Sequence, residues 1–426
     1  MTRLNRILLL LVGVVFLTNS LRSSSNWTEF RGTQHDGCSD ATGLPLEWSE
    51  QKNIKWKTAI HDRGWSSPVV WRDQIWLTTA TADGHQLYAV CVNLQTGKII
   101  HDLLVFENEQ PQAINNMNSY ATPTPAVEEN FVYVHFGTFG TACLDIKTGT
   151  KIWERRDLNC NHVQGPASSP IIYQHLLILH LEGDDVQFVT ALDKKTGKTV
   201  WTVHRPEEHY RDARPLFRKA YITPIIIQVN GQDQLISNGA LVCQVLEPLT
   251  GKEIWRVVYG YDSTVSMPLF TEGLVLVNTG LDYVDGKQYV RLWAVRPEGH
   301  GDVTHSHVVW KMEENVPGLS SPLAHEGLVF MVDDKGTATC LEAKTGYVVW
   351  QHKLRGSHLP SPVYAEGRVY YSGQKGKTTV VAASRTFKIL AENQLDGEIW
   401  ASPAIVGRSI LLRTDKFLYR IENVTQ

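Results

Sequence analysis

Four aromatic residues occupy the same place in a repeated pattern. Trp65, Tyr120, Tyr221 and Trp400 each lie three residues before a proline that follows Ser or Thr. Aromatic rings at the start of a strand can stack on a sugar, a peptide or a flat cofactor. The same rings can instead be wedged between neighbouring repeats as core residues. The sequence leaves both interpretations open, and the four aromatics are therefore candidate ligand-binding residues.

Polar candidates lie in the segments that lead into such strands. The two longest of these segments are residues 107–119, with Asn116 and Asn118, and residues 204–219, with Arg211 and Arg214. His162 closely precedes another of these strands. Long loops in repeat proteins usually mark the binding face, and arginine binds carboxylate or phosphate groups bidentately. A solvated charged loop without a partner is the alternative. We expect these five residues to share one mouth with the four aromatics.

No pattern in the sequence predicts catalysis or a metal site. There is no Ser/His/Asp arrangement, paired-carboxylate spacing or phosphate loop above chance, and no CxxC or zinc-like Cys/His spacing. We therefore expect no catalytic residue, no metal and no cofactor.

The cysteines are interpreted mainly as small buried residues. Cys91, Cys143 and Cys340 each lie six residues before a turn glycine, in a place that alanine takes in another repeat. Such places on neighbouring repeats should be roughly 10 Å apart, too far for a disulfide. Cys38 and Cys160 lie outside these strands and could pair, which the sequence does not decide.

The candidate residues belong to a motif that recurs eight times. Each copy is a proline preceded, at one or two positions, by Ser or Thr and followed by an apolar strand. Successive copies are 40 to 55 residues apart, with prolines at positions 68, 123, 170, 224, 268, 322, 362 and 403. Proline is tolerated at the first residue of a strand. A period of this length over the whole chain predicts a propeller or a solenoid.

A second motif ends most of the repeats. Its clearest copy runs from Ala191 through Asp193 and Thr196-Gly197 to Trp201. Glycine supplies the positive φ of a tight hairpin, the acidic residue accepts hydrogen bonds from turn N–H groups, and the tryptophan can pack against the adjoining repeat. Some copies degenerate: His101 stands where the first repeat should have its tryptophan, and residues 296–309 replace the turn of the fifth.

The two ends of the chain predict that the repeats close into a ring. The eighth copy stops after Phe417 to Ile421 and lacks a fourth strand, whereas Asn53 to Lys57 is a fourth strand without a first three. Pairing the two would leave no open sheet edge. We therefore predict one all-β domain over residues 26–426. It is an eight-bladed β-propeller of four-stranded antiparallel blades, closed by an N-terminal strand in the last blade.

These motifs resemble those of a known family. The Ala-x-Asp-x-x-Thr-Gly-Lys-x-x-Trp copy resembles the tryptophan-docking motif of quinoprotein dehydrogenase propellers, and of the PQQ-like repeat proteins that include the outer-membrane-protein assembly propeller lipoprotein. Trp27-x-x-Phe30-Arg31-Gly32, with Gly43-Leu44-Pro45 and Trp48, resembles exported bacterial PQQ-like repeat proteins. For an enzyme, the resemblance implies a calcium ion held by Glu, Asn and Asp, a tryptophan beneath the quinone and often a disulfide between adjacent cysteines. This chain has no adjacent cysteines and no aspartate matching the catalytic base.

The N-terminus and the composition bear on where the protein works. Arg3 and Arg6 precede an apolar run from Ile7 to Leu17, as in a signal peptide, which we place at residues 1–25. An uncleaved anchor is the alternative, although the run is shorter than the roughly 20 residues of a membrane span. The chain has 41 Lys+Arg against 44 Asp+Glu and a net charge of −3, which does not favour a nucleic-acid partner.

Together these features predict an exported periplasmic or cell-surface protein without a membrane span after cleavage. We expect a monomeric, non-catalytic binding or scaffold protein that holds a protein or glycan of the cell envelope at one mouth of the channel. The alternative is a PQQ-dependent oxidoreductase.

Overall fold

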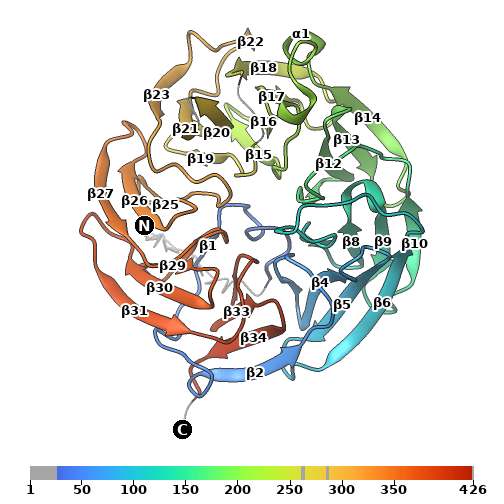
Figure 1. Ribbon diagram of the computed structural model, residues 1–426, viewed down its shortest axis with the longest axis vertical. Helices are drawn as coiled ribbons and strands as arrows, with labels where there is room; N and C mark the ends of the chain where they lie inside the picture. Colours follow the sequence, from blue (N-terminus) through green and yellow to red (C-terminus); the bar gives the residue numbers. More distant parts are fainter. Residues whose placement is uncertain (1–25, 261–263, 285–286, 425–426) are drawn as a thin grey trace, which may run out of the picture.

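Eight sheets surround a central axis and confirm the predicted propeller (Figure 1). The computed structural model describes residues 26–260, 264–284 and 287–424, so the expected signal peptide lies outside the described residues. Each blade has four antiparallel strands that follow one another from the axis to the rim, and two blades carry a fifth.

The first four blades take up the first part of the chain. The first contains β3 (Val69–Trp71), β4 (Gln74–Ala80), β5 (Gln86–Asn93) and β6 (Ile99–Glu107). The second contains β7 (Ala126–Val127), β8 (Phe131–His135), β9 (Thr141–Asp145) and β10 (Lys151–Arg155). The third contains β11 (Ile171–Tyr173), β12 (Leu176–Glu182), β13 (Gln187–Asp193) and β14 (Thr199–His204). The fourth contains β15 (Ile225–Val229), β16 (Gln232–Asn238), β17 (Val242–Leu246) and β18 (Glu253–Val258).

The last four blades complete the ring. The fifth contains β19 (Leu269–Thr271), β20 (Leu274–Val284), β21 (Lys287–Val295) and β23 (Val308–Met312). The sixth contains β24 (Leu323–His325), β25 (Leu328–Val332), β26 (Thr337–Glu342) and β27 (Val348–Lys353). The seventh contains β28 (Val363–Ala365), β29 (Arg368–Ser372), β30 (Lys377–Ala382) and β31 (Ile389–Gln394). The eighth contains β32 (Ala404–Val406), β33 (Ser409–Arg413), β34 (Phe417–Glu422) and, from the other end of the chain, β2 (Ile54–Ala59).

A few short elements lie outside this pattern. They are β1 (Cys38–Ser39), which pairs in parallel with β28, β22 (Gly301–Asp302), which pairs in parallel with β18, the single-turn helix α1 (Glu207–Tyr210), and the 3₁₀ turns η1 (Gly137–Phe139) and η2 (Pro215–Phe217). The long segment that replaces the turn of the fifth blade therefore adds a strand to its neighbour. In the described residues no helix is long and apolar enough to cross a membrane.

The predicted closure of the ring is confirmed. Strand β2 pairs antiparallel with β34, and Trp56 lies opposite Arg420 (Figure 1). The Trp56 indole also donates to the main-chain oxygen of Leu94 in the first blade, at 2.9 Å. The seam between the ends of the chain is thus held by a sheet ladder and by a tryptophan contact.

In five blades a tryptophan of the turn motif docks its blade on the next, whereas Trp255 of the fourth blade donates to Gln234 Oε1 of its own blade. The Trp153 indole donates to Lys194 O at 3.0 Å, and that of Trp201 to Pro248 O at 3.1 Å. The turn glycine is needed because a Cβ at Gly197 would lie 2.7 Å from the Trp153 ring, and its φ is 70°. In the first blade His101 takes over this contact and bonds to Lys147 O at 3.1 Å.

The N-terminal segment crosses the bottom of the ring. Its successive residues bond to successive blades: Trp27 to Val70, Thr28 to Val127, Glu29 to Ile172, and Arg31 to Ser321, Pro322 and Pro362. Gly32 is required next to this crossing, because its φ is 88° and an added Cβ would lie 3.1 Å from the Trp27 ring. The conspicuous Trp-x-x-Phe-Arg-Gly sequence is therefore a plug, which we call the N-terminal plug (residues 26–37).

Candidate functional site

The register of the second blade differs from the predicted one and corrects one site residue. In six of the other seven blades a Ser or Thr directly precedes the motif proline, and in five of these its hydroxyl accepts a backbone N–H from the preceding blade. In the second blade the residue that accepts this bond is Thr124, before Pro125, and not Thr122, before Pro123. Three residues before Pro125 stands Thr122. Tyr120 was therefore placed at the channel by counting from the wrong proline.

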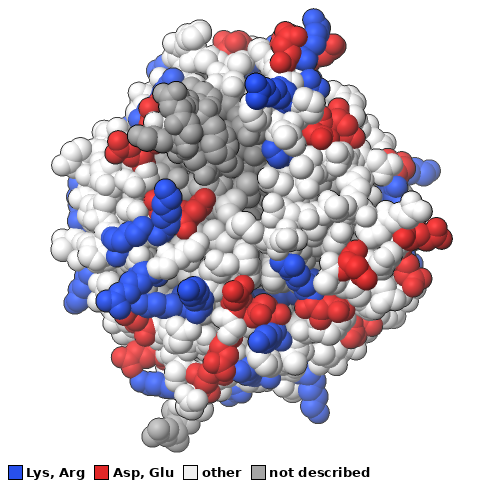
Figure 2. All heavy atoms as spheres, viewed as in Figure 1, with Lys and Arg blue, Asp and Glu red and all other residues white. Residues whose placement is uncertain are grey.

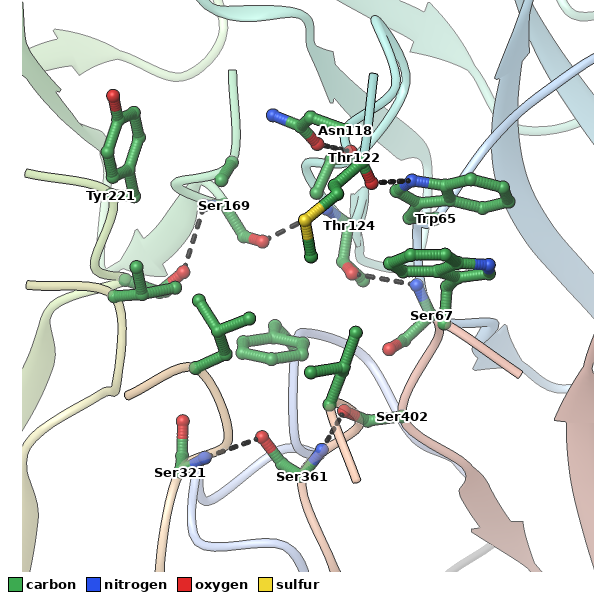
Figure 3. Close-up of a pocket in the computed structure, with 18 of the residues that line it drawn as sticks. Trp65, Ser67, Asn118, Thr122, Thr124, Ser169, Tyr221, Ser321, Ser361 and Ser402 are labelled. Atoms are coloured by element: carbon green, nitrogen blue, oxygen red, sulfur yellow. Dashed lines mark hydrogen bonds between the residues drawn. The ribbon is translucent and has the colours of Figure 1, made fainter. Parts of the chain in front are cut away.

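Eight residues at this place surround the mouth of the central channel and form what we call the collar. They are Trp65, Thr122, Ala167, Tyr221, Val265, Leu319, Leu359 and Trp400. Trp65 and Trp400 stack on each other across the seam, with ring centroids 5.0 Å apart (Figure 3). The collar confirms that the positions before the inner strands face one opening rather than separate blade cores.

A ring of hydroxyl groups follows two residues further along each inner strand. We call Ser67, Thr124, Ser169, Thr223, Ser321, Ser361 and Ser402 the hydroxyl ring; the eighth place is Met267. Six of these hydroxyls accept a backbone N–H from the preceding blade at 2.9 to 3.0 Å, as between Ser67 N and Thr124 Oγ1 (Figure 3). Each such bond contributes about 0.5–1.5 kcal/mol, so the motif Ser or Thr ties the blades together at the axis.

Collar, hydroxyl ring and plug enclose a cavity of about 290 Å³, which we call the cup. Each collar residue lies three positions before the motif proline of its blade, and each residue of the hydroxyl ring lies one position before that proline. The N-terminal plug bonds to residues two positions after the proline, such as Val70 and Ile172. The inner strands therefore lead from the mouth down to the plug, where Phe30 completes the lining. The cup is open at the collar and closed at the plug.

The lining of the cup carries no charged side chain. Beyond the collar, the hydroxyl ring and Phe30, it consists of Asn115, Met117, Asn118 and Gln164. No Asp, Glu, Lys, Arg or His of the described residues lines it. On the face shown in Figure 2, acidic and basic residues are interspersed.

Four of the nine predicted site residues, Trp65, Asn118, Tyr221 and Trp400, line the cup. Asn118 has a structural task as well, because its amide donates to Gln164 O and Pro166 O at 2.9 and 3.1 Å. These four come from three different blades and a loop, and the fold brings them together as predicted.

Asn116 and Tyr120 belong instead to a neighbouring cavity of about 190 Å³, which Asn118 also lines. The Asn116 carbonyl accepts a bond from Arg63. Tyr120 is buried against Phe139 and donates its hydroxyl to Gln112 O at 2.8 Å. Its ring packs in the blade core, which is the structural alternative named above for the aromatics.

His162, Arg211 and Arg214 do not line the cup. His162 is buried, burial lowers its pKa to about 4, and its Nε2 accepts the Thr138 N–H at 3.0 Å. Its main-chain oxygen accepts the Tyr221 hydroxyl at 2.7 Å, so it positions a collar residue. Arg211 pairs with Glu207 at 3.2 Å next to α1, where its side chain is 64% exposed (Figure 1), and Arg214 is exposed over Phe217.

The cysteines are free, which excludes the possible pair between Cys38 and Cys160 in this structure. Cys38 lies in β1, and burial raises its pKa to about 12. Cys91, Cys143 and Cys340 are fully buried in the blade cores, as predicted for a small buried slot.

Sequence reasoning missed the hydroxyl ring, Gln164 and the plug. The sequence did contain a signal for the hydroxyl ring, because a Ser or Thr directly precedes the motif proline in seven of the eight blades once Pro125 is taken as the proline of the second blade. The Trp-x-x-Phe-Arg-Gly motif did not indicate where Phe30 lies in the fold. Its position depends on contacts such as the one between Arg31 and Ser321, which are 290 residues apart in the chain.

The chain resembles known proteins in sequence family and in fold. A family profile described as outer membrane protein assembly factor BamB matches residues 185–307 and 301–398, together half of the chain. No curated protein sequence matches it. The fold is similar to that of a europium-containing methanol dehydrogenase, at 12% identity and a TM-score of 0.66 over 92% of this chain and 90% of the other.

Two further structures show the same architecture. BamB from Moraxella catarrhalis is 11% identical with a TM-score of 0.57 over 86% of this chain and 99% of the other. Quinohemoprotein alcohol dehydrogenase ADHIIG from Pseudomonas putida HK5 is 12% identical with a TM-score of 0.58 over 94% of this chain and 81% of the other. At these identities the likeness is one of fold. The family profile and the eight-bladed ring of tryptophan-docked repeats together show that the chain belongs to the PQQ-like propeller family of outer membrane protein assembly factor BamB.

Proposed function

We propose that this protein is an exported, non-catalytic binding protein that holds a protein or glycan of the cell envelope in the cup. The observation that carries the proposal is the uncharged lining of a cavity closed at one end. Concave, largely apolar sites with a few directed polar groups are typical of ligand binding. Membership of the family of an outer membrane protein assembly factor supports a place in the envelope.

The lining also speaks against an enzyme. General acid–base catalysis requires a group that exchanges a proton near neutral pH, such as a carboxyl or an imidazole, and neither is present in the described lining. Tyr221, a collar residue with an ionisable side chain, donates its hydroxyl to His162 O. A reaction at this site would therefore lack a proton acceptor of its own.

The residues of the cup do not fit the quinone and calcium pair of the quinoprotein dehydrogenases. Trp65, Trp400 and the asparagines could serve a flat ligand, but among the described residues no carboxylate lines the cup to hold calcium. The described residues contain no group of three or more His, Cys, Asp or Glu placed to bind a metal ion.

Binding of the quinone tests the proposal directly. Purified protein mixed with PQQ and calcium is expected to show no bound-quinone spectrum and no dye-linked oxidation of alcohols or sugars. Tight stoichiometric PQQ binding with such activity would replace the proposal with the oxidoreductase alternative.

A capture experiment tests the site. Immobilised protein is incubated with envelope extract, and a variant with Ala167→Phe, which fills the cup, is the comparison. Capture should be lost in this variant and kept in Arg211→Ala/Arg214→Ala, because those arginines lie outside the cup. Equal loss in both variants, or in neither, contradicts the cup as the binding site.

A further inference from the structure

The hydroxyl ring has unused hydrogen-bonding capacity. Each of its members is at most 5% exposed, and no described group accepts the proton of any of these hydroxyls. Ser67 Oγ has no hydrogen-bond partner at all in the described structure. In the six hydroxyls that accept a backbone N–H, that bond occupies one acceptor position and leaves the proton free. Ser67 Oγ is itself enclosed by protein atoms, so the wall of the cup presents the other six hydroxyls as donors to whatever fills it.

These donors exclude two classes of ligand. A purely apolar ligand would leave the hydroxyls unpaired in a dry cavity, at about 1–3 kcal/mol for each. A charged ligand would lose its water and meet no opposite charge among the described residues of the lining. Arg31 and Arg413 lie behind the wall, where they donate hydrogen bonds to main-chain carbonyls, such as Ser321 O and Ser66 O, and to the Ser66 hydroxyl. The ligand that fits is uncharged and rich in hydroxyl groups.

The mouth supplies the other two chemistries that such a ligand needs. The collar offers the aromatic surfaces of Trp65, Trp400 and Tyr221, against which the C–H face of a sugar ring can pack. Gln164 is exposed, and its side-chain amide forms no hydrogen bond with any described residue. Asn115 Oδ1 accepts the Met117 N–H and its Nδ2 is left to donate. Amides of this kind both donate to and accept from sugar hydroxyls.

The shape of the cup limits what part of a glycan can enter. A volume of about 290 Å³ is at the lower end of the roughly 300–1,000 Å³ of small-molecule pockets. Phe30 and the N-terminal plug close the far end, so a chain cannot pass through. Building on the binding function proposed above, we propose that the cup binds the terminal unit of an uncharged oligosaccharide, with its hydroxyls on the hydroxyl ring and its apolar face on the collar.

The test uses calorimetry and tryptophan fluorescence with the full-length protein. The probes are neutral linear oligosaccharides of glucose, mannose and N-acetylglucosamine. At least one should bind with one site per chain and change the fluorescence of Trp65 and Trp400. A cyclic oligosaccharide of the same sugar has no chain end and should not bind. Failure of every linear probe, or equal binding of the cyclic one, overturns the inference.

Variants connect the binding to the cup. Ala167→Phe should abolish it, and Gln164→Ala should weaken it about tenfold, the equivalent of one hydrogen bond. Gln34→Ala is the matched control, because Gln34 is equally exposed but lines a separate groove beside the N-terminal plug. If Ala167→Phe does not fold, Gln164→Ala still decides, since its amide has no recorded structural bond. Equal affinities of Gln164→Ala and Gln34→Ala overturn the inference.

The sugar-binding, capture and PQQ experiments together distinguish a failure of this inference from a failure of the proposed function. If no sugar binds but an envelope protein is captured by the parent and not by Ala167→Phe, the glycan assignment is wrong and the binding function stands. If PQQ with calcium binds tightly and supports oxidation, both are wrong.

Discussion

The indole rings of Trp65 and Trp400 lie face to face, with centroids 5.0 Å apart and planes 12° from parallel. One ring enters the first blade and the other the eighth, so the pair joins the two ends of the chain beside the mouth of the cup. Trp65 also donates to Met117 O at 3.1 Å, and Trp400 to Glu398 at 3.0 Å. The stacked pair thus serves both the closure of the ring and the collar.

Removing either tryptophan of this pair should abolish one spectral signal. Trp65→Leu and Trp400→Leu are each expected to remove the exciton signal of the stacked indoles from the far-UV circular dichroism spectrum, because both rings are needed. Loss of the stacking should cost about 0.5–1.5 kcal/mol in urea unfolding. The double variant is the control: its loss of free energy of unfolding should be smaller than the sum of the losses in the two single variants. Strict additivity, or a signal that survives in a single variant, contradicts the coupling.

The turn glycines separate backbone strain from the tryptophan contact. Gly197 and Gly273 have φ of 70° and 74°, but an added Cβ meets the Trp153 ring at 2.7 Å in the first case and nothing within 4 Å in the second. Gly197→Ala should therefore be less stable than Gly273→Ala by about 1–3 kcal/mol, the cost of overpacking. Urea unfolding of the two variants checks this. Equal losses mean that the Trp153 ring moves aside freely.

Closure of the ring should control cooperativity. Deletion of residues 50–58 removes most of β2 and exposes the edge of β34 and the first-blade surface on which Trp56 docks. Exposed strand edges invite pairing between molecules, so we expect aggregation or a broadened transition in calorimetry and light scattering. A deletion variant that stays monomeric and melts like the parent rules out the closure model.

Three buried histidines should make the fold sensitive to acid. Burial lowers the pKa of His135 to about 3, that of His162 to about 4 and that of His180 well below its ordinary value. They stay neutral in the fold, whereas in the unfolded chain they take up protons near pH ~6.5. Stability should therefore fall as the pH drops from ~6.5 to ~4, by up to ~1.4 kcal/mol per pH unit for each histidine.

The contribution of one histidine can be isolated. Urea unfolding of the parent and of His135→Gln between pH ~6.5 and ~5 should show a smaller slope in the variant, because one buried histidine with a lowered pKa is gone while His162, His180 and His358 remain. His35 acts in the opposite direction, because the nearby Glu29 carboxylate raises its pKa in the folded protein. An unchanged slope would mean that His135 is protonated in the folded protein.

The sequence by itself determined the repeat and its closure. Local chemistry is enough for this: Asp145, Thr148 and Gly149 form their turn within five residues, and an unpaired last strand needs the unpaired first one. Trp153 and Trp201 dock where the turn motif predicts, because the following blade offers each of them a turn glycine, Gly197 and Gly251 respectively. These features follow from residues that are close in the chain or repeated along it.

Only the tertiary structure decided the site. Thr122-Pro123 and Thr124-Pro125 are locally equivalent, and cross-blade bonding to Ser67 and Ser169 selects the second, which places Thr122 rather than Tyr120 on the collar. Likewise, Phe30 closes the cup because Arg31 bonds to blades some 290 residues further along the chain. Local sequence preferences do not encode such contacts, since their free energy arises only when distant segments meet around the ring.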